Sequence, residues 1–599
     1  MSDLPANAVV AHWLEALERA LARRDIGAAV KLFAEDECYW RDLAALTWNI
    51  KTMEGRAAIA AMLGATLDAA APVRFAIEGD ARETADTIEA RLSFETRLAR
   101  GRGIVRLEGG RGRTLLTAIG ELKGFEERTG PTRENGVAHG IEPGRKSWAE
   151  RKADDAATLG RTRQPYCLIV GGGQGGIALG ARLKRLGVPA LIVERHARAG
   201  DSWRKRYKSL CLHDPVWYDH MPYIPFPDHW PVFSPKDKLA DWLEAYVTLM
   251  ELSYWTSATC TSARFDDGRK EWTVVVDRAG EAIELRPKHL VLATGMSGVP
   301  IVPVFPGAES FRGEQHHSSR HGSGASHTGK RCVVIGANNS AHDIAADLWE
   351  HGAEVTMVQR SPTIVARSEA LMELAWAPLY SEAALARGIT TEIADLTLAS
   401  IPYRVAPRRN IAVYEQIRAR DQDLYDRLER AGFLYDFGAD NSGIHTAYIR
   451  RGSGYYIDVG ASELIASGQI KLKSRVTVAR IEPQSVRFSD GSETPADLIV
   501  YATGFGSMHG WAAALISQEV ADKVGLCWGV GSDTPKDPGP WEGELRNMWK
   551  PTQQEALWFH GGNLYQSRFY SLILALQLKA RAVGLPTPVY GLQPVHHRE

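Results

Sequence analysis

The feature that most constrains the fold is a strand–turn–helix–strand pattern that occurs twice in the chain. It begins first at Tyr166, in YCLIVGGGQGGIALGARLKRLGVPALIVER, and again at Arg331, in RCVVIGANNSAHDIAADLWEHGAEVTMVQR. In both copies an apolar strand runs into a turn of small residues and an amphipathic helix, the order found in βαβ units that hold a dinucleotide at the helix N-terminus. This approximate duplication predicts an α/β protein with two Rossmann-like dinucleotide-binding domains.

The first turn carries the full GxGxxG fingerprint. Gly171 suits the tight turn, Gly173 lets the backbone approach a pyrophosphate, and Gly176 lets the helix pack closely on the strand. Glu194 ends the second strand, where a carboxylate accepts hydrogen bonds from a ribose diol. A GxGxxG alone also occurs in ordinary surface loops, but the complete unit favours a dinucleotide site.

The second turn is degenerate, with Asn338 and Ala341 at two of the three glycine positions after Gly336. Asn tolerates left-handed backbone and Ala is the next smallest residue, so the turn can survive. Aligning LIVER with TMVQR places Gln359 at the position of the acid and Arg360 beside it. Loss of the carboxylate and gain of a cation favour the 2′-phosphate of NADPH, unless Arg360 merely pairs on the surface.

Composition disfavours several other classes. The 71 Lys and Arg nearly balance the 72 Asp and Glu, which favours a small-molecule partner over nucleic acid. The six cysteines form no CxxC pair, which disfavours a disulfide framework, a metal site and a redox-active thiol pair, so each is expected to be a buried thiol. The chain begins acidic and never reaches the roughly eighteen uncharged apolar residues of a spanning helix. We therefore expect a cytoplasmic protein with no membrane span, and homodimerisation stays open.

Residues 1–127 predict a separate α+β domain. Two helices are expected between residues 6 and 33, broken at Arg24 and Asp25. The strand-like runs RFAIEG, TIEARLSFETRLA, GIVRLEG and RTLLTAIGELKGFEE follow and describe a curved antiparallel sheet. This pattern is similar to the NTF2-like (SnoaL-like) cone over roughly residues 7 to 127.

The pocket of such a cone either binds a molecule or is filled by its own side chains. Trp40, Asp42 and Trp48 lie near its expected position and do not decide between a substrate gate, a dimer interface and a passive attachment.

The remaining chain divides at composition changes and at the start of each nucleotide-binding unit. Residues 128–164 are rich in Gly, Pro and charge and predict a linker. We expect the first nucleotide-binding domain in residues 165–326 and 497–599, and the second in residues 327–496. A helical, charge-rich insertion at about 363–455 either covers the active site or forms an exposed helix pair.

Several further motifs in residues 165–580 resemble the class B flavin-dependent monooxygenases, in particular the flavin-containing monooxygenases and the plant YUCCA-type enzymes. They are GDSWR from Gly200, LVLATG ending at Gly295, DLIVYATGF from Asp497, and FRGEQHHSSRH, which is similar to FxGxxxHxxx[YF] through His317. His321 departs from the aromatic position of that signature, and the Trp of the Baeyer–Villiger branch is also absent. The resemblance implies FAD at the first Gly-rich turn and NADPH at the second.

Two residues are candidates for a catalytic role. His213 stands in SLCLH where animal-type enzymes have an Asn and YUCCA-type enzymes look like LxLH, followed by DPVWYDHMPYIPFP. The resemblance places His213 at the flavin edge or substrate, unless it is a hydrogen-bonded histidine in a packed loop. Asn339, in the NNSAHD turn, could approach the nicotinamide ribose and the flavin.

The C-terminal segment GGNLYQSRFYSLILALQLKAR resembles the final flavin-contacting helix of the family, with Gly562, Asn563 and Gln566 as contacts. Its later residues have the spacing of an ordinary core helix. Together the fingerprints and the resemblance assign the cofactor-binding residues Gly171, Gly173, Gly175, Gly176, Glu194, Arg195, Ser202, Trp203, Thr294, Gly295, Gly336, Asn338, Asn339, Ser340, Arg360, Ser361, Thr503, Gly504, Asn563 and Gln566.

The implied function is an NADPH- and O₂-dependent monooxygenase that inserts one oxygen atom into a small organic substrate through a C4a-(hydro)peroxyflavin. The first alternative is Baeyer–Villiger oxygenation or YUCCA-like oxidative decarboxylation of a 2-keto acid such as indole-3-pyruvate. Such a substrate needs a cation, and spacing does not choose among Arg404, Arg408 and Arg451. A disulfide reductase is disfavoured because no redox-active Cys pair is present. A non-catalytic ligand-binding module is the remote alternative.

Overall fold

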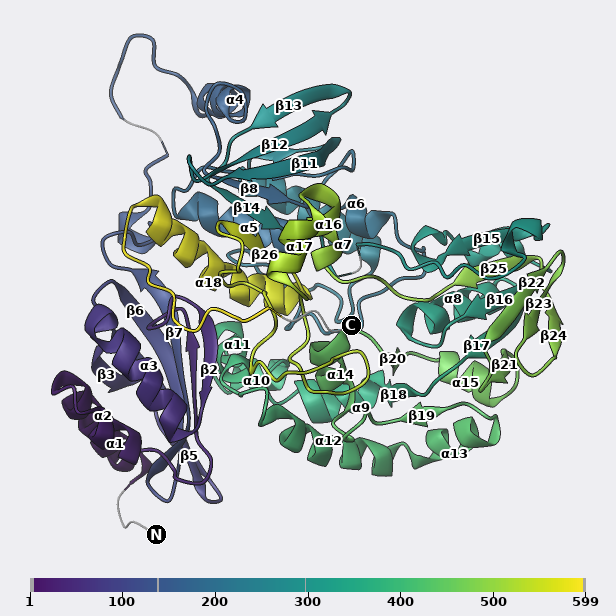
Figure 1. The fold of residues 1–599 in the computed structure, drawn as a ribbon, viewed down its shortest axis with the longest axis horizontal. Helices are drawn as coiled ribbons and strands as arrows, with labels where there is room; N and C mark the ends of the chain where they lie inside the picture. The colour runs from purple at the N-terminus through teal and green to yellow at the C-terminus, as the bar shows by residue number, and fades with distance from the viewer. Residues whose placement is uncertain (1–4, 137–138, 297, 596–599) are drawn as a thin grey trace.

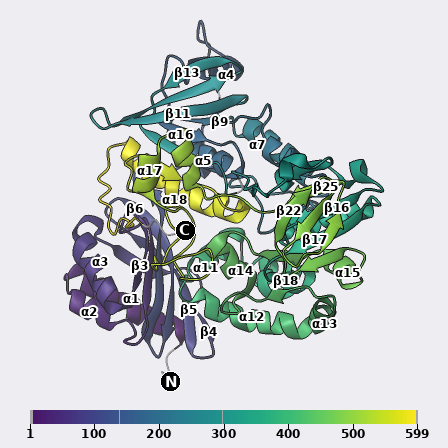
Figure 2. The same cartoon turned by 45° about the vertical axis from the view of Figure 1, so that its right-hand side comes forward.

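The computed structural model describes residues 5–136, 139–296 and 298–595. Figure 1 shows an N-terminal unit, a first nucleotide-binding domain above it, and a second nucleotide-binding domain to its right with a helical layer beneath. Figure 2 shows the same units turned by 45°, with the N-terminal unit still beside helix α18 (Leu564–Ala582) and the helical layer.

The first nucleotide-binding domain is built on a parallel sheet in the order β10-β9-β8-β14-β26. Its strands are β8 (Cys167–Val170), β9 (Ala190–Val193), β10 (Tyr254–Trp255), β14 (His289–Leu292) and β26 (Leu557–Phe559). In chain order this is 3-2-1-4-5, the doubly wound arrangement whose switch point lies beside the first strand. Helix α5 (Gln174–Arg185) follows β8, as the fingerprint predicts. An antiparallel sheet, β11 (Ala258–Asp266), β12 (Glu271–Arg278) and β13 (Glu281–Leu285), is attached.

The second nucleotide-binding domain repeats this plan in the order β15-β25-β16-β17-β21. Its parallel strands are β15 (Glu314–His317), β16 (Arg331–Ile335), β17 (Glu354–Gln359), β21 (Lys471–Ser474) and β25 (Leu498–Tyr501), and helix α8 (Asn339–Glu350) follows β16. A small antiparallel sheet is formed by β22 (Val478–Glu482), β23 (Ser485–Phe488) and β24 (Glu493–Pro495). The predicted fold class, with two Rossmann-like domains, is confirmed.

The insertion is mostly helical, as expected. It contains α9 (Ser368–Leu371), α10 (Glu382–Ala386), α11 (Thr391–Ala399), α12 (Ala406–Arg420), α13 (Gln422–Arg430) and α14 (Gly443–Arg451). A parallel sheet of β19 (Tyr435–Asp436), β18 (Thr363–Arg367) and β20 (Tyr455–Asp458) closes it, and this sheet was not predicted.

The N-terminal unit packs helices on a curved sheet in the order β2-β1-β7-β6-β5-β3. The predicted helices are α1 (Ala6–Ala22) and α2 (Ile26–Lys31), and the predicted strands correspond to β3 (Val73–Ile77), β5 (Thr87–Glu95), β6 (Ala99–Glu108) and β7 (Arg111–Leu122). Sequence reasoning missed β1 (Tyr39–Leu43), β2 (Ile50–Glu54), α3 (Gly55–Ala70) and β4 (Arg82–Thr84). The NTF2-like assignment stays a prediction.

The segment predicted as a linker, residues 128–164, contains a 3₁₀ helix at Gly130–Thr132 and one α-helix, α4 (Trp148–Thr158). A capping box between Ser147 and Glu150 starts this helix, but none of its side chains is buried. It therefore adds no core, which agrees with a connecting role.

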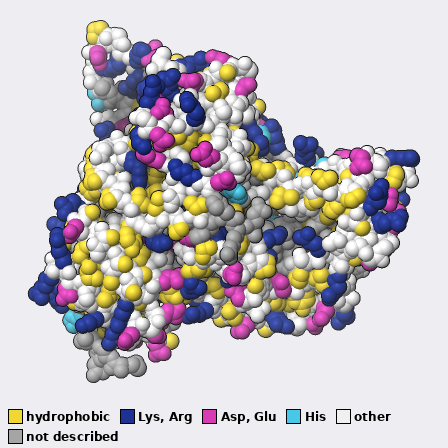
Figure 3. Space-filling view, viewed as in Figure 1, with side chains coloured by type: hydrophobic (Ala, Val, Ile, Leu, Met, Phe, Trp, Pro, Cys, Tyr) yellow, Lys and Arg dark blue, Asp and Glu magenta, His cyan; other side chains and the backbone are white. Residues whose placement is uncertain are grey.

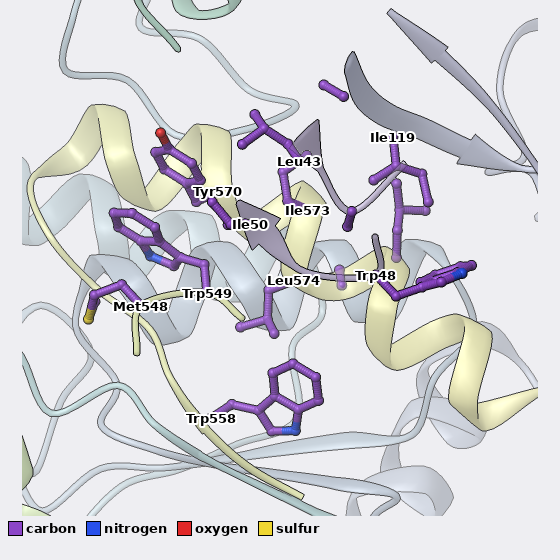
Figure 4. Close-up of a cluster of buried hydrophobic side chains, with 14 of the residues drawn as sticks. Leu43, Trp48, Ile50, Ile119, Met548, Trp549, Trp558, Tyr570, Ile573 and Leu574 are labelled. Carbon is purple, nitrogen blue, oxygen red and sulfur yellow. The ribbon is translucent and has the colours of Figure 1, made fainter. Parts of the chain in front are cut away.

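One side of the N-terminal unit packs against the first nucleotide-binding domain through buried apolar side chains. Figure 4 shows Leu43 next to Ile573 of α18, with Trp48 and Ile119 of the N-terminal unit nearby and Trp549 beside Tyr570. Leu574, the next residue of α18, points toward Trp558 of the first nucleotide-binding domain. Asp42 is fully buried and accepts hydrogen bonds from Thr47, Thr117 and the Leu46 backbone. Trp40, Asp42 and Trp48 are all buried. The two alternatives for the pocket, ligand binding and filling by the protein's own side chains, stay predictions.

A buried ion pair reinforces this contact. Arg41 Nε and Nη2 each lie 2.7 Å from a carboxylate oxygen of Glu544, and both side chains are 2% exposed. Arg41 also donates to the Ala399 carbonyl and to Tyr570 Oη at 3.2 Å, while Thr52 donates to Glu544 at 2.6 Å. One network thus connects the N-terminal unit, the insertion and the C-terminal part of the first nucleotide-binding domain.

The surface in Figure 3 mixes positive and negative side chains and shows no large area of one sign on that face. Among the described residues, no helix combines the length and apolarity needed to cross a membrane. Five of the six cysteines are buried, as predicted, and Cys211 is half-buried.

Replacing Glu544 with Gln should lower the free energy of unfolding by about 3 kcal/mol, because it leaves the Arg41 guanidinium buried without a charged partner. Chemical denaturation monitored by tryptophan fluorescence measures the loss. Glu15→Gln, which breaks the exposed Arg19–Glu15 pair, is the matched control and should change stability by less than about 0.5 kcal/mol. A loss of the same small size in Glu544→Gln would show that the pair does not hold the units together.

Candidate functional site

The first Gly-rich turn has the geometry that the fingerprint predicts. Gly171 has φ +109°, and a Cβ there would lie 2.4 Å from the Ala293 carbonyl oxygen. A Cβ at Gly176 would lie 2.0 Å from the Gly171 carbonyl oxygen, so helix α5 can approach β8 only with glycine at this position. At Gly173 the nearest atom to an added Cβ is Ser202 Oγ, at 3.7 Å, which leaves space beside the turn.

Two hydroxyl groups next to this turn fit the polar groups of a bound dinucleotide. Ser202 Oγ and Thr294 Oγ1 are buried, and neither has a hydrogen-bond partner in the part of the chain that the structure describes. A buried hydroxyl without a partner costs about 1–3 kcal/mol. Trp203 donates to Gln174, and Gln174 donates to the Gly562 carbonyl, which ties the GDSWR segment to the C-terminal motif. These residues fit FAD.

Glu194 is buried at the end of β9, where its carboxylate accepts hydrogen bonds from the backbone N–H of Gly172 and of His196, at 2.8 and 2.9 Å. Each carboxylate oxygen can accept more than one bond, so the predicted ribose contact remains open to it. Arg195, the next residue, is exposed.

His560 was missed by sequence reasoning. It is fully buried between β26 and Gly561, its ring packs near Gly175, and neither ring nitrogen has a hydrogen-bond partner among the described residues. Burial lowers the pKa of His560 to about 3, so its ring is neutral. Only the parallel pairing of β26 with β14 brings it to the first Gly-rich turn, and the sequence carries no signal for that pairing.

The N-terminus of α18 is held by three distant segments. Asn563 caps the helix by accepting from the Gln566 backbone at 3.0 Å, and its Nδ2 donates to Tyr218 Oη at 3.0 Å. Tyr448, on α14 of the insertion, accepts from the Asn563 backbone at 3.0 Å and donates to Gln566 Oε1 at 2.9 Å. The insertion is therefore bonded to the predicted flavin-contacting helix.

The second Gly-rich turn is preserved despite its substitutions. Gly336 has φ +130°, and a Cβ there would lie 2.3 Å from the Ala502 carbonyl oxygen. Asn338 is the N-cap of α8 and Ala341 is buried against the sheet. Asn339 Oδ1 accepts from the Ile457 backbone at 2.9 Å, which ties the turn to β20. Ser340 stands in the first turn of α8, and the contacts of Asn339 and Ser340 with a nicotinamide cofactor stay predictions.

Two neighbouring residues at the end of β17, Gln359 and Arg360, have different surroundings. Gln359 is fully buried and exchanges two hydrogen bonds with the Leu434 backbone, at 2.7 and 2.8 Å. Arg360 and Ser361 are exposed, and Arg360 has no ion pair or hydrogen bond within the described residues. Burial, followed by the charges of Arg451 and Arg360, lowers the pKa of Lys536. Three cations thus lie close together, which fits an anionic group.

His213 is half-buried and faces α8. Its Nε2 lies 3.8 Å from Asp343 Oδ2, which also accepts from Tyr207 Oη at 2.7 Å. Burial raises the pKa of Asp343, while the charge of His213 opposes that shift. His213 therefore stands between the two nucleotide-binding domains, and its catalytic role stays a prediction.

The segment after His213 contributes two acidic groups. Burial raises the pKa of Asp214 to about 7, and burial followed by the Asp214 charge holds the pKa of Asp219 well above its usual range. Burial and then the same charge raise the pKa of Tyr218 and Tyr455. Asp214 therefore lies near the tyrosines that surround the N-terminus of α18, although sequence reasoning did not select it.

The remaining motifs line the junction of the two domains. His317 Nε2 lies 3.0 Å from the Gly504 carbonyl oxygen, and Thr503 donates to the Ile301 carbonyl at 2.5 Å. His321, at the aromatic position of the signature, lies 3.3 Å from Asp347 Oδ2. Gly295 has φ +80°, as the turn after β14 requires. Within the described ranges, no group of three or more His, Cys, Asp or Glu side chains could hold a metal ion.

Comparison with known proteins identifies proteins of similar sequence and a solved structure of similar fold. The family model for pyridine nucleotide-disulphide oxidoreductases matches residues 168–393. The indole-3-pyruvate monooxygenase YUCCA1 of Oryza sativa subsp. japonica is 32% identical over 366 residues, covering 60% of this chain and 82% of that protein. The probable indole-3-pyruvate monooxygenase YUCCA9 of Arabidopsis thaliana is 29% identical over 397 residues, covering 64% and 81%. The solved structure of OTEMO with FAD and NADP has a TM-score of 0.50 at 18% identity, covering 70% of this chain and 84% of that chain, a likeness of fold.

Replacing Gly176 with Ala should strip FAD from the protein, because the new methyl group would meet the Gly171 carbonyl and displace the pyrophosphate turn. The ratio of flavin to protein absorbance after purification should fall at least tenfold. Gly64→Ala, in helix α3 with only the Ile26 side chain at 3.8 Å, is the control and should keep its flavin. Normal flavin content in Gly176→Ala would place the pyrophosphate elsewhere.

Replacing Asp214 with Asn should stabilise the protein at pH 8. The Asp214 carboxyl has a pKa of about 3.9 in the unfolded chain and about 7 in the folded protein. Its contribution to the free energy of unfolding is therefore complete only below about pH 4 and is lost as the pH rises through 7. The variant should gain about 1–2 kcal/mol at pH 8, and the gain should shrink as the pH falls toward 4. Denaturation midpoints at both pH values test this, with exposed Asp228→Asn as control. A gain independent of pH would contradict the prediction.

Proposed function

Because the chain belongs to the family of the YUCCA-type flavin-dependent monooxygenases, we propose that its reaction is the oxidative decarboxylation of a 2-oxo acid of the indole-3-pyruvate type. It is an NADPH- and O₂-dependent flavoprotein monooxygenase that inserts one oxygen atom into a small organic substrate. The observation that carries the proposal is the match to indole-3-pyruvate monooxygenases, together with His213, which keeps their LxLH pattern.

FAD, when bound, supplies the activation of O₂ after its reduction by NADPH. The chain's residues provide position and protection. Gly171 and Gly173 leave room for the pyrophosphate, and the hydroxyls of Ser202 and Thr294 would bond its oxygens. Tyr448 and Tyr218 fix the N-terminus of α18, which would lie beside the bound flavin and would help to exclude water from it.

His213 and Asp214 are the groups that would hold or move a proton at the reacting centre. Asp214 has a pKa of about 7, so near neutral pH it can both donate and accept a proton. His213 Nε2 faces Asp343, which would orient its ring toward the space between the two domains.

Arg360, Arg451 and Lys536 would bind the 2′-phosphate of NADPH. Of the three arginines considered for a substrate carboxylate, Arg404 and Arg408 pair with Glu54 and Glu37. Arg451 donates only to the Ser453 and Gly454 carbonyls within the described chain.

A disulfide reductase is less compatible with the chain, although the matching family model carries that chemistry in its name. Five of the six thiols are buried and the sequence has no CxxC pair. Baeyer–Villiger oxygenation is the second candidate within the family, and the cytoplasmic location, the homodimer and the NTF2-like domain stay predictions.

The deciding experiment supplies the purified holoenzyme with NADPH, O₂ and one of three substrates: indole-3-pyruvate labelled with ¹³C in its carboxyl group, cyclohexanone, or methyl phenyl sulfide. The proposal expects ¹³CO₂ in a one-to-one ratio with NADPH consumed, and little turnover of the other two. Lactone formation without ¹³CO₂ would replace the proposal by Baeyer–Villiger chemistry. Hydrogen peroxide as the sole product with all three would remove the monooxygenase assignment.

Replacing Arg360 with Ala should raise the KM for NADPH roughly ten- to hundredfold, since one charge-assisted contact contributes about 1.5–3 kcal/mol. The KM for NADH should stay within about twofold of wild type. Arg264→Ala, another exposed arginine that forms no ion pair in the described structure, is the control. Equal losses with both coenzymes would show that the 2′-phosphate binds elsewhere.

A further inference from the structure

A cavity of about 1010 Å³ lies where the insertion meets the C-terminal part of the first nucleotide-binding domain. Its walls come from residues 403–411 at the start of α12, from α14, and from the loop of residues 530–541. Its volume is at the upper end of the range for drug-sized ligands.

This cavity borders a different face of α14 from the one that contacts the N-terminus of α18. His445, Thr446 and Ile449 of α14 line the cavity. Tyr448 of the same helix instead bonds to Asn563 and Gln566 at the N-terminus of α18. One helix therefore borders two separate sites.

Two guanidinium groups in the cavity wall have only weak partners. Arg408 Nη1 lies 2.7 Å from Glu37 Oε2, and the Arg408 side chain is 65% exposed. Arg404 Nη2 lies 3.3 Å from Glu54 Oε2, and its side chain is 43% exposed. Exposed pairs of this kind contribute about 0–1 kcal/mol, and each guanidinium keeps further N–H donors for another anion.

The rest of the wall is mixed. It contains polar groups, among them Asp533 and Asp440, which pairs with Arg450, and it also offers aromatic and apolar surfaces. The Arg404 guanidinium lies 3.9 Å from the centroid of the Trp541 ring, and Ile411, Val530 and Pro540 contribute apolar groups. Arginine on an aromatic face beside an apolar wall suits a ligand that carries both an anionic group and a ring system.

His445 adds an uncommitted polar group. It is half-buried on α14, and its ring has no hydrogen-bond partner among the residues that the structure describes. Burial lowers its pKa, so near neutral pH the ring offers one donor and one acceptor without adding charge.

We propose that this cavity is a second ligand site, which binds an organic anion of drug size with a carboxylate or sulfonate next to Arg404 and Arg408 and an aromatic body against Trp541. The lining of this cavity contains none of the residues assigned to FAD or NADPH, so the proposal does not depend on the identity of the oxygenated substrate. Because α14 borders both sites, a ligand in this cavity would contact the helix that carries Tyr448.

The test uses 1-anilinonaphthalene-8-sulfonate as the anionic probe and N-phenyl-1-naphthylamine as its uncharged counterpart. Binding to the FAD-loaded protein is measured by isothermal titration calorimetry with NADP⁺ saturating, so that the nicotinamide site is filled. The sulfonate should bind with a stoichiometry of one, and the uncharged probe at least tenfold more weakly.

The variant Arg404→Ala with Arg408→Ala should weaken sulfonate binding at least tenfold and leave the uncharged probe within twofold. The matched control, Glu37→Gln with Glu54→Gln, breaks the same ion pairs but keeps both cations, and should bind the sulfonate as tightly as wild type or more tightly. Ile411→Trp narrows the cavity without removing a charge, and it should weaken the binding of both probes. It replaces the arginine variant as the test if that variant does not fold.

Wild-type sulfonate affinity in the arginine variant, or in Ile411→Trp, would overturn the proposal. Equal affinity of wild type for the two probes would also overturn it, because the site would then not select an anion.

Discussion

The burial of helix α18 is the constraint on which the rest of the structure depends. Fourteen of its nineteen residues are buried, because it packs on α5 on one side and on β7 of the N-terminal unit on another. Arg568 is inside this helix and donates to both oxygens of Asp395 on α11, at 2.8 Å each, and to the carbonyls of Tyr218 and His220. Removing one partner of such a buried pair costs about 3–5 kcal/mol, so the helix, the insertion and the 214–227 segment hold one another in place.

The arrangement of the residues in the candidate site depends on helix α18. The N-terminus of α18 is fixed by Asn563, and the groups that surround it, Tyr448 and Tyr218, belong to segments that Arg568 and Asp395 hold together. A satisfied polar network of this kind specifies one arrangement more strongly than apolar packing alone. The N-terminal unit supports the same helix from its other side through Trp48, Ile119 and the Arg41–Glu544 pair.

The two nucleotide-binding units show how one plan serves two ligands. Both turns keep a glycine with positive φ against a facing carbonyl, at Gly171 and at Gly336. They differ at the end of the second strand, where Glu194 is kept in the first and Gln359 replaces it in the second. The side-chain amide of Gln359 is hydrogen-bonded to the Leu434 backbone, and the neighbouring Arg360 remains available to bind an anion.

The insertion interacts with more of the protein than its sequence suggested. The two alternatives for its role, a cover over the active site and an exposed helix pair, stay predictions. It contributes Tyr448, which bonds to the N-terminus of α18, Asp395, which pairs with Arg568, and part of the wall of the cavity beside Arg404 and Arg408.

The sequence by itself determined what depends on local pattern. Spacing within about thirty residues predicts the two βαβ units, helices α1 and α2, the degenerate second turn and the cation at Arg360, because periodicity and turn chemistry act directly over that range. Only the structure shows that Arg360 forms no ion pair among the described residues. Tertiary structure decided what depends on distant partners. Strand β1 reads YWRDL, with two charges that suggest a surface, yet all five of its residues are buried.

That burial is possible because Glu544 neutralises Arg41 from 503 positions away and Thr117 satisfies Asp42 from 75 positions away. The same reason explains why His560, Lys536 and Asp214 were not found. Each becomes part of a site only when the sheet order and the packing of α18 bring it beside residues to which the local sequence does not point.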